Sequence, residues 1–210
     1  MTRKVQRVRV RLDAGGVRSL TPEEIRAILR GADEMIMRGG RTLLMKLLKG
    51  SRSKDVVAKS LDQCPVYGYY KYRSNDEIMD RIDWLILNGY LAVEYDYRLP
   101  LLVYTERGWA IERETYADEL LRKLDEAGDG ISFFDVSQLK DRHREVIWRV
   151  LDKIEESGDA KYVPLLEAWE RIDYKKVRQR IRGVIGRLSA GSPPNAKDGP
   201  SDERSLEARG

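Results

Sequence analysis

The chain has 210 residues, of which 41% are hydrophobic and 35% are charged, and its formal net charge is +4. This composition excludes a wholly disordered protein, and the length suits one or two domains of roughly 100 to 200 residues each. Cys64 is the only cysteine and His143 the only histidine, which excludes an internal disulfide and a four-ligand Cys/His zinc site. We find no apolar signal segment and no run of about 18 apolar residues, so we expect a soluble, cytoplasmic protein.

Positive and negative charges are distributed unevenly along the chain. Residues 1–73 hold 17 Lys and Arg against 7 Asp and Glu, whereas residues 74–130 hold 6 against 14. Between residues 38 and 73 only Asp55 and Asp62 oppose nine cations. Such an excess can attract a polyanion, and ordinary solvated surface charge is the alternative interpretation.

The N-terminal third alternates between strand-like and helix-like patterns. In residues 4–12, Val and Leu alternate with Arg, which predicts a half-buried strand with an arginine face. Thr21, Pro22 and Glu24 then stand at the spacing of a capping box, so we expect a helix to begin there. After the Gly39-Gly40 pair a second helix is expected, and Gly50 should end it.

The next segment predicts a helix followed by a hairpin. Ser74 and Glu77 form a second capping-box spacing, and the helix should end at Asn88-Gly89. Two apolar-alternating runs, 90–95 and 101–105, predict strands joined by a five-residue tip, before another helix over roughly 109–127. Packed helices followed by a hairpin favour a mainly α fold with a small β-hairpin wing (α+β), a winged helix-turn-helix, followed by a C-terminal helical hairpin unit.

Three segments carry a family resemblance: LDQCPVYG at residues 61–68, LILNGYL at 85–91 and LVYTERG at 102–108. Together they resemble the RecQ C-terminal (RQC) winged-helix domain over about residues 24–115, and RGGRTLL at 38–44 looks like a stand-alone bacterial branch of that family. The resemblance implies binding to duplex or forked DNA, with the wing at a strand junction. The 210 residues contain no phosphate-binding loop, so unwinding would need a helicase or another DNA-repair protein in trans.

The predicted recognition helix after Ser74 is acidic, which shifts the expected DNA contacts to the basic segment before it. Four acids, at positions 76, 77, 80 and 83, line its outer face with only Arg81 opposing. We therefore predict phosphate contacts from Arg52, Lys54, Lys59, Lys71 and Arg73, a second tier of Arg41, Lys46 and Lys49, and wing-tip contacts from Tyr97 and Arg98. Solvated surface charge is the alternative for each basic residue, and a protein interface is the alternative for the wing tip.

Tyrosines at 67, 69, 70 and 72 lie within the same basic segment. Exposed bases can stack on such rings, and packing within the fold is the favoured alternative. We expect Tyr67 to pack against the helices, and Tyr70 and Tyr72 to be the surface candidates.

No pattern in the sequence indicates a catalytic centre, a metal site or a cofactor. Cys64 is expected to be a buried structural thiol and His143 a surface residue. The chemistry expected of the chain is therefore binding.

The C-terminal part is helical by its periodicity, with breaks at Gly158-Asp159 and near Asp173. Residues 158–188 resemble one HEAT repeat, and a second basic surface is expected from Lys175, Lys176, Arg178, Arg180 and Arg182. We divide the chain into an N-terminal strand and linker (1–20), an RQC-like domain (21–128), a HEAT-like helical unit (129–188) and a disordered tail (189–210). A protein-interaction adaptor and a winged-helix transcription regulator remain alternatives to a DNA-structure-binding protein.

Overall fold

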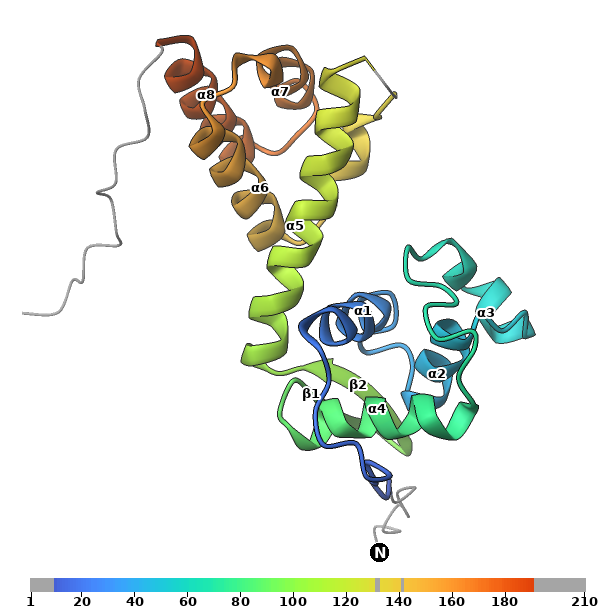
Figure 1. Cartoon of the computed structure of the whole chain (residues 1–210). Coiled ribbons are helices and arrows are strands. Elements are labelled where there is room, and N and C mark those ends of the chain that lie inside the picture. Colours follow the sequence, from blue (N-terminus) through green and yellow to red (C-terminus); the bar gives the residue numbers. More distant parts are fainter. Residues whose placement is uncertain (1–9, 131–132, 141, 191–210) are drawn as a thin grey trace, which may run out of the picture. The chain divides into compact units, whose positions relative to one another are not determined.

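The computed structural model describes residues 10–130, 133–140 and 142–190 and is mainly helical (Figure 1). The chain divides into two compact units, residues 1–116 and 117–210. The division falls inside helix α5 (Glu106–Gly128), so one continuous helix contributes to both units. The boundary that we predicted after residue 128 stays a prediction. No helix in the described part of the chain is both long and apolar enough to cross a bilayer.

The first unit contains the helices α1 (Pro22–Asp33), α2 (Arg41–Lys49), α3 (Lys54–Ala58), the short 3-10 turn η1 (Leu61–Gln63) and α4 (Asn75–Leu87). Both predicted capping boxes are present, Thr21 with Glu24 and Ser74 with Glu77. Gly50 ends α2 in the left-handed conformation with φ 77°. The predicted starts of α1 and α4 and the end of α2 are therefore confirmed.

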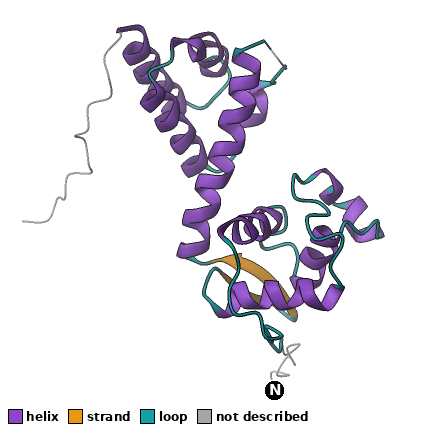
Figure 2. Cartoon of the chain, viewed as in Figure 1, coloured by secondary structure: helices purple, strands orange, loops and turns teal. Residues whose placement is uncertain are grey.

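The wing is an antiparallel hairpin of β1 (Leu91–Asp96) and β2 (Leu99–Tyr104), drawn orange in Figure 2. Asp96 pairs with Leu99, so the connecting turn contains only Tyr97 and Arg98. The predicted five-residue tip is wrong, because Asp96 and Pro100 look like turn residues but belong to the strands. Proline is tolerated in a strand with a free edge, and Tyr97 takes the positive φ of 54° that a tight hairpin turn requires.

The core of the first unit joins the helices to the wing. Fully buried side chains include Ile28 of α1, Leu47 of α2, Ile82 of α4 and Leu102 of β2. Helices packed on one another with a hairpin after them form a winged-helix fold, which confirms the predicted fold class.

The second unit contains the remainder of α5, η2 (Val136–Leu139), α6 (Arg144–Ser157), η3 (Ala160–Tyr162), α7 (Val163–Glu170) and α8 (Lys175–Ala190). The predicted breaks near Gly158 and Asp173 are confirmed, since α6 ends before the first and α8 begins after the second. Trp169, Val150 and Ile181 lie in its core. Two residues of the predicted tail, 189 and 190, belong to α8, and 191–210 lie outside the described residues. The HEAT-like assignment stays a prediction.

The predicted N-terminal strand falls mainly on residues 4–9, which lie outside the described residues. The described remainder, residues 10–12, has no strand structure. Its Val10 N–H donates to the Tyr95 hydroxyl at 3.4 Å, and the Asp13 N–H donates to the Asp83 carboxylate at 2.9 Å. This part of the chain is held by side chains of β1 and α4 in place of a ladder of backbone hydrogen bonds, so the strand prediction is wrong for it.

Candidate nucleic-acid interface

Hydrogen bonds gather basic residues at the C-terminal end of α2. The Lys49 Nζ donates to the carbonyl oxygens of Lys71 at 2.9 Å and Arg73 at 2.5 Å. The Tyr70 N–H donates to the Leu48 carbonyl at 2.8 Å, so the segment that carries both cations is docked on the helix end. We call Lys49, Arg52, Lys54, Lys71 and Arg73 the basic corner.

The approach of the two chain segments at the basic corner depends on Gly50. A Cβ placed on Gly50 would lie 3.1 Å from the Cα of Gly68, and the φ of Gly50 is positive. The Gly68 N–H donates to the Leu47 carbonyl at 3.0 Å. A glycine at position 50 therefore allows the tyrosine-rich segment to meet the end of α2.

Most cations of the basic corner have no internal ion pair. Arg52 and Lys54 are exposed, and no carboxylate among the described residues pairs with them. The same holds for Lys59 at the end of α3, and the Lys71 Nζ lies 4.9 Å from the centre of the Tyr72 ring. Arg73 shares a solvent-exposed ion pair with Glu77 at 3.5 Å. Apart from Arg73, these cations have no carboxylate partner among the described residues and are available to an external anion.

Two second-tier cations bind carboxylates within the fold. Arg41 pairs with Asp83, a buried residue of α4. Lys46 pairs with Asp55 at 3.1 Å and links α2 to α3. Both cations form ion pairs within the first unit, and their role in DNA contact stays a prediction.

The wing approaches the other end of α2. The Met37 N–H donates to the Leu102 carbonyl at 3.1 Å, and the Leu102 N–H donates to the Gly39 carbonyl at 2.9 Å. Nine residues of α2 separate this end from the basic corner, a length of about 14 Å. Arg38, which the site prediction omitted, is exposed beside this junction. In the sequence, the position of Arg38 directly before the Gly39-Gly40 pair could have identified it as a candidate contact residue.

The wing tip presents large exposed side chains. Tyr97 is 69% exposed and Leu99 is 63% exposed. The Arg98 guanidinium lies 5.6 Å from the centre of the Tyr97 ring. Tyr97 and Arg98 are thus both at the surface, as an external contact would require.

The exposure of the tyrosines differs in part from the prediction. Tyr72 is 90% exposed, whereas Tyr70 is only 5% exposed, so Tyr70 is wrong as a surface candidate. The Tyr70 hydroxyl donates to the Glu24 carboxylate at 3.0 Å, and burial followed by the Glu24 charge raises its pKa. Tyr67 packs against the core as expected.

The outer face of α4 carries the exposed acids Asp76 and Glu77. Asp83 is buried and pairs with Arg41, so the prediction that Asp83 lies on this face is wrong. Burial, followed by the neighbouring carboxylates of Asp13, Asp76 and Asp83, raises the pKa of Asp80. Negative groups on this face repel phosphate. The geometry does not favour the insertion of α4 into a major groove.

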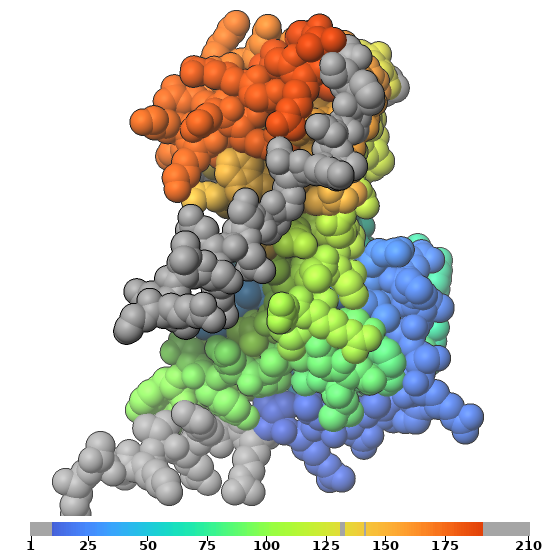
Figure 3. Space-filling model, turned by 90° about the vertical axis from the view of Figure 1, so that its left-hand side faces the viewer, coloured from blue at the N-terminus to red at the C-terminus, as the bar shows by residue number. Residues whose placement is uncertain are grey.

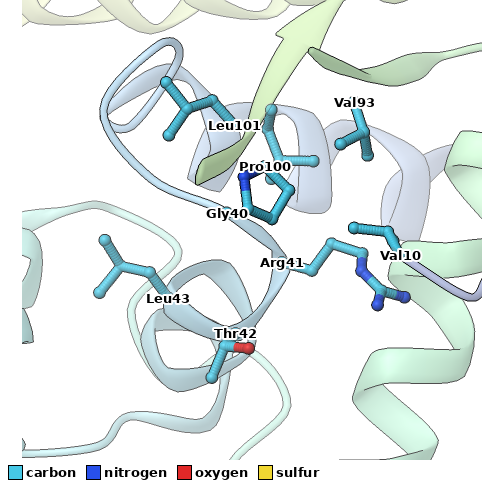
Figure 4. A pocket seen from close by; sticks show the side chains of 9 residues that line it. Val10, Gly40, Arg41, Thr42, Leu43, Val93, Pro100 and Leu101 are labelled. Atoms are coloured by element: carbon cyan, nitrogen blue, oxygen red, sulfur yellow. The ribbon is translucent and has the colours of Figure 1, made fainter. Parts of the chain in front are cut away.

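A cavity of about 380 Å³ lies between the wing and the start of α2. Figure 4 shows Arg41 at this cavity, with Val10, Val93 and Pro100 around it. The Arg41 guanidinium is bound to Asp83, so the cavity offers mainly apolar walls. The described residues contain no cluster of three or more His, Cys, Asp or Glu that could hold a metal ion.

The two residues with unique chemistry have structural positions. Cys64 is buried in the core of the first unit, as expected. His143 is exposed, and its Nδ1 accepts a hydrogen bond from the Glu145 N–H at 3.3 Å at the start of α6.

Comparisons with known proteins support a family assignment. The family model of the RQC domain matches residues 21–126, which is half of the chain and includes α1, the basic corner, α4 and the wing. No curated protein and no solved structure gives a significant match. The RQC domain is the DNA-binding winged-helix domain of RecQ helicases and is not itself catalytic. With its winged-helix unit and the matched segment, the chain belongs to the RQC domain family.

Proposed function

We propose that this protein binds duplex or forked DNA through phosphate contacts of the basic corner, without reading a base sequence. The observation that carries the proposal is the division of the cations. Arg52, Lys54 and Lys71 are exposed without a carboxylate partner among the described residues, whereas Arg41 and Lys46 pair with Asp83 and Asp55.

The proposed contacts are made to phosphate groups by cations that stand on irregular segments and a short helix. Lysine and arginine at a DNA backbone release counterions and bind without base specificity. Lys49 fixes the carbonyls of residues 71 and 73, so the cations of that segment are presented from an ordered backbone. Ordering before binding lowers the entropic cost of the contact.

The acidic face of α4 favours recognition of DNA structure over recognition of a base sequence. Base readout in the major groove requires donors and acceptors on an inserted helix. The exposed face of α4 carries Asp76 and Glu77 instead. A winged-helix transcription regulator is for this reason the weaker alternative.

The wing supplies the preference for a fork in this proposal. Tyr97 and Leu99 are exposed apolar side chains at the end of a short hairpin, and Arg98 adds a charge. Such side chains can stack on a terminal base pair, and the cation can meet its phosphate. We place the protein with the cellular DNA, in the cytoplasm or nucleoid, where a helicase or another DNA-repair protein acts in trans.

Fluorescence anisotropy over a salt series tests the proposal. The slope of log affinity against log salt changes by about 0.9 for each phosphate of duplex DNA that the protein neutralises, so Arg52→Ala/Lys54→Ala should reduce it by about 1.8. Arg18→Ala/Arg26→Ala is the matched control, because both residues are exposed and have no ion pair within the described part of the chain. It removes the same charge outside the basic corner.

The alternatives give different results in the same assay. Absence of binding at low salt would overturn the proposal and favour a protein-interaction adaptor. Strong discrimination among duplex sequences would favour a transcription regulator. An equal slope for the corner variant and its control would remove the basic corner as the binding surface.

A further inference from the structure

Helix α8 carries two kinds of cation. Arg180 binds Asp152 at 2.7 Å and Glu155 at 2.5 Å, and Arg187 also binds Glu155. Arg182 binds Glu170 of α7 at 2.5 Å. These arginines hold α8 against α6 and α7, so Arg180 and Arg182 belong to the structure of the unit more than to the predicted basic surface.

The cations at the start of α8 are different. Lys175, Lys176 and Arg178 are exposed, and none of them has a carboxylate partner among the described residues. Arg171, at the end of α7, is also exposed without such a partner in the described part of the chain. The four side chains come from the turn between two packed helices and the first turns of α8.

The single carboxylate near these cations, that of Asp173, is occupied by internal hydrogen bonds. Residues 171–182 contain six cations and a single acid, Asp173. Asp173 is 7% exposed and accepts hydrogen bonds from the Trp169 Nε1 and the Tyr174 N–H, each at 2.6 Å. Its charge stabilises the turn and leaves the exposed cations uncompensated.

An exposed aromatic ring lies among these cations. Tyr174 is 57% exposed, and the Lys140 Nζ lies 5.3 Å from its ring centre. The Arg178 N–H donates to the Tyr174 carbonyl at 3.0 Å, so Arg178 stands one helical turn from the ring. An exposed ring close to cations can stack on a base while the cations meet its phosphates.

This arrangement opposes the stability of α8. The first turn of α8 holds no acid, and cations at a helix N-terminus interact unfavourably with the helix dipole. An anionic ligand bound there would offset this unfavourable interaction.

We propose that the α8 corner, defined as Lys140, Arg171, Tyr174, Lys175, Lys176 and Arg178, binds single-stranded DNA. The residues of α7 and α8, orange to red in Figure 3, form a continuous surface on the face shown. The inference goes beyond the proposed function, because the contact belongs to the second unit and takes a different form of DNA. Charge complementarity selects a polyanion, and the exposed ring selects a strand whose bases are unpaired.

Anisotropy of the full-length chain with an oligothymidylate tests this. The salt slope for single strands changes by about 0.7 for each phosphate, so Lys175→Ala/Lys176→Ala should reduce it by about 1.4. Tyr174→Ala should weaken binding about 5- to 150-fold, which corresponds to about 1 to 3 kcal/mol of stacking on one base. Tyr174→Phe keeps the ring and should bind like the parent protein.

The control is again Arg18→Ala/Arg26→Ala, which removes two exposed charges from the first unit. Equal slopes for the α8-corner variant and this control would overturn the inference. Unchanged affinity of Tyr174→Ala would also overturn it, as would competition by polyglutamate at the same charge concentration as oligothymidylate.

The experiments can contradict the basic corner and the α8 corner separately. A reduced salt slope for duplex DNA in Arg52→Ala/Lys54→Ala, with an intact single-strand response, supports both. Normal single-strand behaviour with no duplex binding by the parent protein would overturn the proposed function and retain the α8 corner. The reverse result would overturn the α8 corner alone.

Discussion

Arg41 and Asp83 form an ion pair that joins the first residue of α2 to α4. The Asp83 carboxylate is 2% exposed and also accepts a hydrogen bond from the Asp13 N–H at 2.9 Å. One buried carboxylate thus links three segments of the first unit. The arginine that the charge pattern suggested as a phosphate contact is a structural residue of the winged helix.

Removal of Arg41 should destabilise the first unit. Arg41→Ala leaves the Asp83 carboxylate buried without its partner, which costs about 3 to 5 kcal/mol of unfolding free energy. Arg41→Met/Asp83→Leu removes both charges and should recover much of that loss. Urea unfolding measures both variants, and a decrease below about 1 kcal/mol in Arg41→Ala would show that the pair contributes little.

Glu24 should make the stability of the first unit sensitive to acid. Burial alone would raise the pKa of Glu24, but hydrogen bonds from Thr21, Tyr70 and Arg81 lower it below its ordinary value of 4.5. A lowered pKa contributes stability that is present above pH 4.5 and is lost as the pH falls through the folded-state value.

The variant Glu24→Gln isolates this contribution. At neutral pH it should be less stable than the parent, and the difference should shrink as the pH falls below 4.5. Denaturant unfolding at a series of pH values measures the difference. A gap that stays constant into strong acid would contradict the assignment to Glu24.

Glu155 should be the main electrostatic link within the second unit. It is 7% exposed and pairs with Arg180 and Arg187 of α8. Glu155→Ala removes hydrogen bonds to charged groups and should cost about 1.5 to 3 kcal/mol. The neighbouring Glu156→Ala breaks only an exposed pair with Arg149 and should cost less than about 1 kcal/mol. Hydrogen exchange of the α8 amides compares the two, and equal exchange rates would contradict the prediction.

The wing tip should set the preference for forked over blunt DNA. Tyr97→Ala/Leu99→Ala removes the two exposed apolar side chains that flank Arg98 and should lower that preference several-fold, since a stacked base is worth about 1 to 3 kcal/mol. Phe133→Ala removes an exposed ring of the second unit and should leave the preference unchanged. A fork-to-blunt affinity ratio that is the same in all three proteins would rule out a wedge.

The sequence by itself determined where most helices begin and end, because those signals are local. Thr21 and Ser74 cap helices through residues three positions later, and Gly50 ends α2 through its own backbone conformation. The order of these elements, and the three segments that resemble the family, were enough to predict a winged helix and the DNA-binding class. The hairpin tip was the local exception, because Asp96 and Pro100 are common in turns as well as tolerated in strands.

Only the tertiary structure decided which charged and aromatic side chains face outward. Arg41 pairs with Asp83, which is 42 positions away in the sequence. The Tyr70 hydroxyl donates to Glu24, which is 46 positions away. No local sequence pattern distinguishes Arg52 and Lys54 from Arg41, yet both side chains remain exposed. A cation's availability depends on the carboxylates that packing brings near it, and packing joins residues whose separation along the chain carries no signal.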